Sequence, residues 1–390
     1  MIAQCMRVAL LNSNYVKISK HTKKGTEILS YILIKELKRY ANRYHLDLTA
    51  YASGNSKLPV KIESISFQNA VNNKYLSLEQ KKLLEIALIA KAFSQHDNFD
   101  LYHVNIGNGE STLPFAGFVK KPILITMHGD LGQSDKKYFS LYKNIPNVYF
   151  ISISNYQRKP IPSLNYVKTI YHGIDIKNDF KFNSIGGEEI MWAGRAAPEK
   201  GLDIVLDISQ KTAKQAKIFP IVKDEFLEWL NNALTKKRGL IKHQIKMEII
   251  FNLNRFQLRE HYQTSRLFLF PIKWEEPFGF VMAESLACGT PVVAYARGSA
   301  PEIVKDGITG FLVNSSPTDV RGDFIIKKTG VEGLCEAVEK IYAMSPEEYM
   351  NMRKACRTDA ENRFSVDRMV KEYIELYYQI TGQKMPQDSA

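Results

Sequence analysis

The chain has 390 residues, more than one hydrophobic core usually organises, so two domains of ordinary size are expected. Hydrophobic residues make up 45% of the chain and charged residues 24%, a balance that excludes a mainly disordered protein. No apolar run approaches the roughly 18 residues typical of a membrane-spanning helix, and the first residues lack the pattern of a signal peptide. The cysteines have no metal-ligand spacing, which favours a reduced, cytoplasmic protein; they are Cys5, Cys288, Cys335 and Cys356.

The net charge of +12 is unevenly distributed. Residues 1–180 contain 24 Lys and Arg against 13 Asp and Glu, whereas the remainder contains 29 against 28. This asymmetry indicates an anionic partner for the first half, either an acidic acceptor, a membrane surface or nucleic acid, or it serves only solubility.

In the first half, short apolar strands alternate with amphipathic helices, the pattern of a parallel α/β sheet. The predicted strands are 7–11, 46–51, 62–67, 101–104, 123–127 and 148–153. The predicted helices are 25–44 and 75–93.

A second strand–helix series begins after a loop at 177–187. The predicted strands are 189–193, 216–222, 246–251, 267–271 and 291–295. The predicted helices are 202–211, 227–234, 258–265, 281–288 and 301–305, and the last 55 residues are expected to be helical, ending with 366–380. Two doubly wound, Rossmann-like domains are therefore predicted, over 1–178 and 179–363.

The segment 274–291 directly follows a predicted strand, at the edge where doubly wound folds bind ligands. Gly279 would let a ligand approach the backbone beside a helix N-terminus. Glu276 in the loop and Glu284 one turn into the helix are suited to accept hydrogen bonds from sugar hydroxyls. A capped surface helix with ordinary acidic residues is the alternative.

The segment 194–201 likewise follows a predicted strand and opens a helix. Arg195 and Lys200 lie on a predicted turn with Gly194 and Gly201 at its ends, an arrangement that can fold two cations around a diphosphate. The alternative is a turn with solvated charges.

These two segments resemble the retaining glycosyltransferases of family 4, which have the GT-B fold of two Rossmann-like domains facing each other across a cleft. Glu276 and Glu284 match the Glu-x7-Glu pattern of that family. Further similar segments are 171–175, 297–304, 306–313 and 363–365, the last preceding an aromatic-rich helix that resembles one crossing back to the N-terminal domain. The resemblance covers about residues 100–380 and implies that the C-terminal helix, about 364–390, joins the first domain.

The resemblance implies roles for single residues. Arg195 and Lys200 would neutralise the donor diphosphate, Glu276 would orient the donor sugar, and Glu284 would hold the ribose hydroxyls. The remaining donor-binding positions would act through their backbone; they are Gly25, Gly194, Phe278, Gly279 and Phe280. His128, after the strand 123–127, would reach the sugar and acceptor, although a lone histidine after a strand is more often structural. His172 is expected to be structural.

No Asp-x-Asp occurs in the chain, so no metal site and no cofactor are expected, the nucleotide sugar being a co-substrate. The implied reaction is metal-independent transfer of a sugar, with retention, from a nucleoside-diphosphate donor, a UDP-sugar being favoured, to an unknown acceptor such as a cell-envelope lipid or glycan. The alternatives are a nucleotide-sugar epimerase, and a protein that binds an anionic ligand without turnover.

Nucleic-acid binding is not expected, because the lysines are not interleaved with a nucleic-acid motif. Peripheral contact with the inner face of a membrane is a further hypothesis. It depends on lysines of the loop before the first helix and of the helix 75–93; they are Lys17, Lys20, Lys23, Lys24, Lys81, Lys82 and Lys91. The same helix pattern arises when a helix packs on a sheet.

Overall fold

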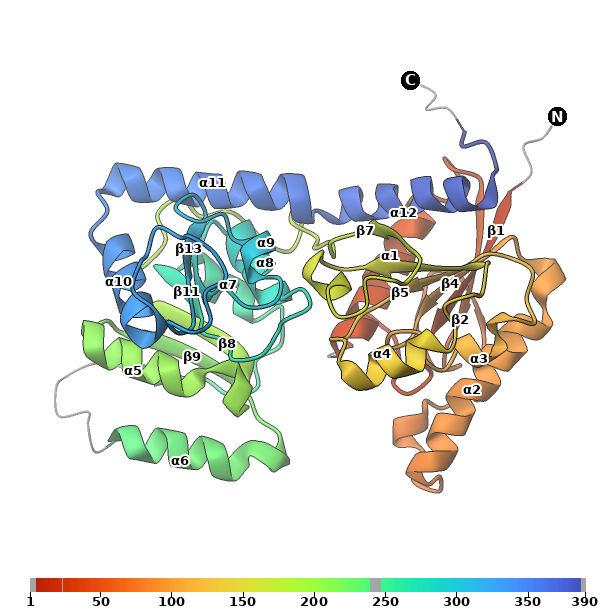
Figure 1. The fold of residues 1–390 in the computed structure, drawn as a ribbon, viewed down its shortest axis with the longest axis horizontal. Helices are drawn as coiled ribbons and strands as arrows, with labels where there is room; N and C mark the ends of the chain where they lie inside the picture. Colours follow the sequence, from red (N-terminus) through yellow and green to blue (C-terminus); the bar gives the residue numbers. More distant parts are fainter. Residues whose placement is uncertain (1–4, 23, 239–246, 387–390) are drawn as a thin grey trace. The chain divides into compact units, whose positions relative to one another are not determined.

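A computed structural model describes residues 5–22, 24–238 and 247–386 of the chain. It divides into two compact units, coloured along the sequence in Figure 1. Unit 1 comprises Met1–Gly173 and Val366–Ala390, and unit 2 comprises Ile174–Ser365. Each unit is an α/β fold around one parallel sheet, the predicted fold class.

Unit 1 contains a seven-stranded parallel sheet in the order β3-β2-β1-β4-β5-β6-β7. Its strands are β1 (Met6–Asn12), β2 (Leu46–Tyr51), β3 (Lys61–Glu63), β4 (Leu101–Asn105), β5 (Ile123–Thr126), β6 (Val148–Ser152) and β7 (Tyr166–Thr169). Five of the six predicted strands are confirmed with small changes at their ends. The strand predicted over 62–67 is reduced to the short β3, and β7 was not predicted.

The helices of unit 1 are α1 (Gly25–Tyr40), α2 (Leu78–Ser94), α3 (Leu113–Ala116), α4 (Gln133–Ser140) and α12 (Val366–Thr381). Its 3-10 helices are η1 (Ala70–Asn72), η2 (His96–Asn98) and η3 (Tyr156–Arg158). The helix predicted from residue 75 begins only at Leu78, because Ser77 caps it. The helix predicted to residue 44 ends at Tyr40, before a turn in which His45 has a φ of 41°.

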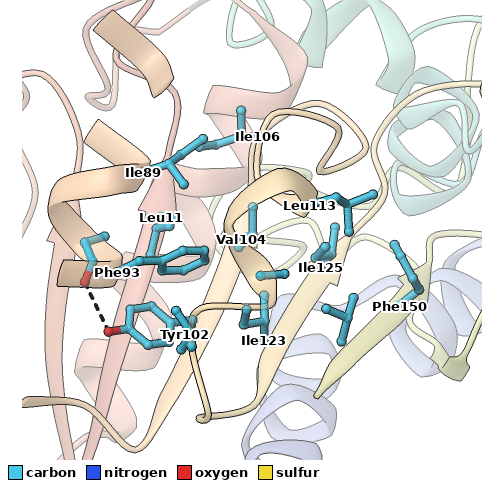
Figure 2. Close-up of a cluster of buried hydrophobic side chains, with 14 of the residues drawn as sticks. Leu11, Ile89, Phe93, Tyr102, Val104, Ile106, Leu113, Ile123, Ile125 and Phe150 are labelled. Carbon is cyan, nitrogen blue, oxygen red and sulfur yellow. Dashed lines mark hydrogen bonds between the residues drawn. The ribbon is translucent and has the colours of Figure 1, made fainter. Parts of the chain in front are cut away.

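The core of unit 1 lies between the sheet and the helices that cover it (Figure 2). Ile89 and Phe93 of α2 pack against apolar residues of β1, β4 and β5. The hydroxyl of Tyr102 satisfies its hydrogen-bonding capacity inside the core by donating to the carbonyl of Ala92 at 3.1 Å. The central strands are buried on both faces, as expected for a parallel sheet.

The C-terminal helix α12 groups with unit 1, as the resemblance implied. Its Tyr378 hydroxyl donates to the carbonyl of Tyr44 at 2.6 Å. Tyr377 lies 2.6 Å from Nδ1 of His103, and the Tyr373 hydroxyl lies 3.0 Å from the Thr126 hydroxyl. Aromatic side chains thus pack α12 along the core and bring their polar ends to partners in the sheet.

Unit 2 contains a six-stranded parallel sheet in the order β10-β9-β8-β11-β12-β13. Its strands are β8 (Ile190–Arg195), β9 (Ala216–Ile221), β10 (Met247–Ile249), β11 (Leu267–Phe270), β12 (Val292–Tyr295) and β13 (Gly310–Val313). All five predicted strands are confirmed in their described residues, the predicted residue 246 lying outside them. The strand β13 was not predicted.

The helices of unit 2 are α5 (Leu202–Thr212), α6 (Leu227–Arg238), α7 (Leu258–Gln263), α8 (Phe280–Ala287), α9 (Ala300–Ile303), α10 (Gly330–Tyr342) and α11 (Pro346–Phe364). Its 3-10 helices are η4 (Pro198–Lys200) and η5 (Asp224–Phe226). One prediction is corrected here. Gly194 and Arg195 do not lie on the turn after the strand but are the last two residues of β8, because their backbone continues the parallel ladder with β9.

The strand orders locate the ligand-binding edge of each sheet. In unit 2 the chain runs from β8 outward to β9 on one side and returns to β11 on the other, and in unit 1 the same reversal occurs between β1 and β4. Doubly wound sheets bind ligands beyond the carboxyl ends of the strands at such a reversal. The segments after β8 and β11 therefore form the first place to look for a site in unit 2.

Candidate functional site

Two of the predicted site residues meet at the carboxyl edge of the unit 2 sheet. Lys200, five residues beyond the end of β8, places its Nζ 2.9 Å from Oε2 of Glu276, in the loop after β11. Both side chains are largely buried, with exposed fractions of 14% and 16%. The indole Nε1 of Trp274 donates to the same carboxylate oxygen at 3.2 Å, and the Lys200 ammonium lies 4.4 Å from the centre of the Trp274 ring. Lys200 is thus fixed by an ion pair and a cation–π contact.

The backbone holds these two loops together. The amide of Lys273 donates to the carbonyl of Glu199 at 2.8 Å, and the Trp192 indole donates to the carbonyl of Lys200 at 3.2 Å. Gly201 has a φ of +73°, and a Cβ there would lie 2.1 Å from the carbonyl oxygen of Pro271. Only glycine fits this close approach without displacing one of the loops.

Arg195 is held less firmly than Lys200. Its guanidinium lies 3.9 Å from the Glu199 carboxylate, at the outer limit of an ion pair, and 37% of the side chain is exposed. A pair at this distance and exposure contributes little, so the planar guanidinium fork is available to an incoming anion. The structure thus pairs Lys200 with Glu276, and Arg195 with Glu199.

The loop after β11 is shaped by its contact with the segment after β12. The amide of Ser299 donates to the carbonyl of Glu276 at 2.8 Å, and its hydroxyl donates to the carbonyl of Phe278 at 2.7 Å. Gly298 has a φ of +56°, and a Cβ there would lie 2.3 Å from the backbone of Glu276. The Phe278 carbonyl already accepts a hydrogen bond within the protein. The expected contact of the Phe278 backbone with the donor is therefore assigned to its amide.

Gly279 and Phe280 lie where the predicted helix begins. Gly279 is the left-handed N-cap of α8, with a φ of +80°, and Phe280 is the first helical residue. The first amides of a helix have no partner within it, and the helix dipole favours an anion there. The two positions can thus supply backbone donors to a phosphate or sugar oxygen.

Glu284 lies in the second turn of α8 and is buried. Its Oε1 accepts a hydrogen bond from Nε of Arg255, a residue that the sequence argument did not single out. Burial raises the pKa of Glu284, and the neighbouring Arg255 acts in the opposite direction. Nη2 of Arg255 is buried and has no hydrogen-bond partner in the described part of the chain. The sequence feature that could have indicated Arg255 is its position a few residues beyond the predicted strand 246–251.

The neighbouring Glu275 has a different function from Glu276. Its carboxylate accepts from the amide of Gly298 at 2.6 Å and forms ion pairs with Arg297 at 3.1 Å and with Arg321 at 2.7 Å. All of these contacts stay within unit 2. Glu275 therefore braces the loop, and Glu276 is the carboxylate paired with the site lysine.

In unit 1, His128 lies two residues beyond Thr126, the last residue of β5. Its Nε2 lies 3.2 Å from Oδ1 of Asn105, and its ring stacks on that of His172 with centroids 5.6 Å apart. Burial lowers the pKa of His128 to about 3, so the ring is neutral at physiological pH. Gln157 fixes the turn by donating to the carbonyls on either side of His128. His172 is buried against His128, consistent with a packing role.

Gly25 is the first residue of α1, the position predicted for it. A Cβ there would meet nothing within 4 Å, so the helix N-terminus is open on that side. Gly25 and His128 belong to unit 1, whereas the other predicted site residues belong to unit 2. Among the described residues, no group of three or more His, Cys, Asp or Glu is arranged to hold a metal ion.

Of the lysines in the membrane hypothesis, Lys24 pairs with Glu27 at 3.1 Å and Lys91 with Glu63 at 2.8 Å, and Lys23 lies outside the described residues. None of the helices in the described part of the chain is long and apolar enough to span a bilayer. Peripheral membrane contact stays a prediction.

A comparison with known protein families finds a match in unit 2. Residues 175–359 match the family model described as glycosyl transferases group 1. The match lies within unit 2 and includes Arg195, Lys200, Glu276 and Glu284. The group 1 match and the relatives below support a glycosyltransferase.

Two curated relatives align with parts of the chain. An uncharacterized 41.2 kDa protein in the cps region of Klebsiella pneumoniae is 24% identical over 228 residues, covering 55% of this chain and 56% of that protein. D-inositol 3-phosphate glycosyltransferase of Mycobacterium leprae is 33% identical over 135 residues, covering 33% of this chain and 30% of that enzyme. The chain thus spans about half or less of the length of these relatives.

A solved structure extends the likeness to both units. The Anabaena protein HepE, in complex with UDP and glucose, superposes with a TM-score of 0.68 at 18% identity, covering 96% of this chain and 100% of that one. At this identity the likeness shows the fold alone. Two Rossmann-like units, with the C-terminal helix grouped with the first, are the GT-B fold.

Proposed function

We propose that the protein is a retaining glycosyltransferase that moves a sugar from a nucleoside-diphosphate donor without a metal ion. The observation that carries the proposal is the contact between Lys200 and Glu276, beside the β8–β11 reversal of the unit 2 sheet. It places a cation and a hydroxyl-binding carboxylate at one point, as a sugar diphosphate requires. The group 1 family match over this unit supports the glycosyltransferase part of the proposal.

Lys200 and Arg195 are assigned to the departing diphosphate. The Lys200 ammonium has three N–H donors, and one of them donates to Glu276. The others and the Arg195 fork would bind phosphate oxygens as negative charge accumulates on them. Fixed cations in a water-poor site stabilise such charge more than water does.

Glu276 and Glu284 are assigned to the two sugars of the donor. Glu276 would accept hydrogen bonds from hydroxyls of the transferred sugar, and Glu284 from the ribose hydroxyls. Arg255 would keep the buried Glu284 carboxylate ionised and oriented, and its Nη2 would donate to the nucleotide. UDP is the favoured nucleotide because the similar HepE structure contains it.

The proposed chemistry of the transfer is the one that the resemblance to retaining enzymes implies. The bond between the anomeric carbon and the phosphate oxygen breaks, and a new bond forms to an acceptor oxygen on the same face of the sugar. The acceptor proton passes to the departing phosphate oxygen. His128, neutral because burial lowers its pKa to about 3, would act as a hydrogen-bonding group toward sugar or acceptor and not as a cation.

Two other functions use the same residues differently. An epimerase would convert the donor with no acceptor present, and a non-catalytic binder would hold the nucleotide without turnover. The transferase, the epimerase and the non-catalytic binder are distinguished by nuclear magnetic resonance of the donor. The donor is incubated with the protein in the presence and absence of a panel of sugar-alcohol acceptors, and each incubation is repeated with EDTA. We expect an α-linked product from an α-linked donor, formed equally with EDTA. Inversion at the anomeric carbon would overturn the proposed retention. Loss of activity with EDTA would overturn the proposed independence of a metal ion.

A further inference from the structure

Two adjacent carboxylates, Glu275 and Glu276, follow β11, and they differ in their hydrogen bonds. Glu275 accepts two hydrogen bonds from the Arg321 guanidinium, at 2.7 and 2.9 Å. It accepts two more, from Nη1 of Arg297 at 3.1 Å and from the amide of Gly298 at 2.6 Å. A carboxylate offers about four lone-pair sites, so Glu275 has none left for a ligand.

Glu276 is in the opposite state. Lys200 and Trp274 both donate to its Oε2. No donor among the described residues of the chain reaches its Oε1, which is left to accept a hydrogen bond from a ligand. Of the two neighbouring carboxylates, only Glu276 can therefore bind a sugar hydroxyl.

The cations that occupy Glu275 belong to a closed set of four charges. Arg297 and Arg321 each also pair with Asp319, at 2.7 Å in both cases. The side chains of this set are partly buried, with exposed fractions between 22% and 29%. Two guanidinium groups balance two carboxylates, so the set carries no net charge. The paired N–H donors of Arg321 match the two Glu275 oxygens, which fixes the direction of the contact.

Arg321 is presented to Glu275 by an ordered loop, the segment 314–329 between β13 and α10. Asn314 closes this loop at its base. Its Oδ1 accepts from the amide of Arg321 at 2.7 Å, and its Nδ2 donates to the carbonyl of Gly322 at 2.9 Å. The backbone that carries the guanidinium is therefore held in place.

Without these cations, Glu275 would be a rival of Glu276. The Lys200 ammonium has three N–H donors, and a second carboxylate in the same loop could draw it away from Glu276. Two unpaired carboxylates on adjacent residues would also repel each other. Neutralising Glu275 removes both effects.

We propose that Arg297 and Arg321 are positioning residues of the donor site. By neutralising Glu275, they leave Glu276 as the carboxylate that pairs with Lys200. Glu276 then accepts a hydroxyl of the donor sugar through its Oε1. This inference rests on the proposed function. The alternative is that Arg321 only ties the loop 314–329 to the segment after β11.

The two readings predict opposite results when the charge of Glu275 is also removed. The measurement is the release of nucleoside diphosphate from a panel of UDP-, GDP- and ADP-sugars. Arg321→Gln should lower kcat by roughly tenfold, within the range of coupling between contacting side chains. The double variant Glu275→Gln/Arg321→Gln should recover most of this loss, because the rival charge is gone. The affinity for UDP, which lacks the transferred sugar, should be unchanged in both variants.

Trp274 provides a readout that needs no turnover. Its indole donates to Glu276, and its ring lies 4.4 Å from the Lys200 ammonium. Movement of Lys200 changes the surroundings of this ring. The tryptophan emission of Arg321→Gln should therefore shift from that of the parent protein, and the emission of the double variant should return to it. If the parent releases no nucleoside diphosphate, the proposed function fails, and the emission still decides the role of Arg321.

Two further variants serve as controls. Arg321→Lys keeps the charge without the planar fork and should lose less turnover than Arg321→Gln. Lys327→Gln removes a cation of the same loop, which pairs with Asp323 at 2.5 Å, and should behave like the parent.

Three results would overturn the proposal. The first is a double variant as impaired as Arg321→Gln in turnover and emission, since a lost tie or a damaged fold is not restored by Glu275→Gln. The second is parent-like turnover and emission in Arg321→Gln. The third is a loss of UDP affinity in Arg321→Gln as large as its loss of turnover, because the effect would then not lie at the sugar.

Discussion

At the carboxyl edge of its sheet, unit 2 carries buried ion pairs, whereas the same edge of unit 1 carries stacked neutral histidines. In unit 2, Lys200 pairs with Glu276, and Arg255 pairs with Glu284. In unit 1, His128 stacks on His172, and burial lowers the pKa of both rings. Fixed charges suit a polyanionic diphosphate, and neutral groups suit a hydroxyl-bearing partner. The difference supports the proposal that unit 2 binds the donor and unit 1 the acceptor.

The largest expected effect comes from removing the cations of unit 2. Lys200→Ala and Arg195→Ala should each lower kcat/KM by roughly 100- to 1,000-fold, by analogy with lost oxyanion-stabilising donors worth about 2.7–4 kcal/mol. Steady-state release of nucleoside diphosphate measures both. Near-normal turnover in the double variant would remove the assignment of these two residues.

The second prediction concerns acid stability and separates the two units. Burial lowers the folded-state pKa of His103 and His128 to about 3, so the unfolded chain binds more protons between that value and about 6.5. The stability is therefore complete above about pH 6.5 and is lost as pH falls, by up to about 1.4 kcal/mol per pH unit for each histidine.

Two probes distinguish the units in this experiment. All three tryptophans, Trp192, Trp229 and Trp274, belong to unit 2, whereas circular dichroism reports both units. Between pH 7 and pH 5, the urea transition followed by circular dichroism should gain an early component that tryptophan fluorescence lacks. His103→Gln should reduce this component. An equal shift of both probes would contradict the difference between the units.

A smaller effect is expected from Arg255. Burial raises the pKa of Glu284 and Arg255 opposes this rise, so Arg255→Gln should raise the pKa further. The carboxylate is then protonated over a wider range, and UDP should bind about tenfold more weakly at pH 6, a loss equivalent to about 1.4 kcal/mol. Tyr262, Arg259 and Cys288 also face Glu284 and are unchanged in this variant.

Isothermal titration calorimetry at several pH values measures this effect. The affinity of the Arg255→Gln variant should recover as pH rises, whereas Arg321→Gln, which removes a brace of Glu275, should bind UDP with no new pH dependence. A deficit that stays constant from pH 6 to pH 9 would mean that Arg255 contacts the nucleotide without acting through Glu284.

The smallest effect is expected at Lys273, which pairs with Asp203 at 2.7 Å beside the site. Both side chains are well exposed, and such pairs contribute about 0–1 kcal/mol. Lys273→Ser should therefore change the equilibrium constant of unfolding and kcat/KM by no more than about fivefold. A tenfold loss of kcat/KM would show that the whole positive field of this edge matters, and not the two assigned cations.

The two units also differ in how far their sequences predicted them. In unit 2, Arg195, Lys200 and Glu276 were predicted from segments rich in glycine and charged residues. Such segments are visible in the sequence because close backbone approaches, such as that at Gly201, require glycine at fixed positions. The strand β13 was missed because its residues were considered only as part of the similar segment 306–313. Arg255 was missed because its partner Glu284, 29 residues away, is set by the tertiary fold.

In unit 1, β2 was predicted with its observed bounds, since its apolar residues alternate with the polar Asp47 and Thr49. The elements α3, α4 and β7 were missed because they are short or polar and have no marked periodicity. The stacking of His128 on His172 joins residues 44 positions apart in the chain, and no local pattern indicates such a contact.

The most direct measurement is mass spectrometry of the purified protein incubated with a panel of UDP-, GDP- and ADP-sugars, with and without EDTA. We expect one donor, a UDP-sugar, to release its nucleoside diphosphate equally in both conditions, and Glu276→Ala to abolish the release. Silence across the panel, together with no thermal shift on addition of any nucleotide, would contradict the assignment of unit 2 as a donor site.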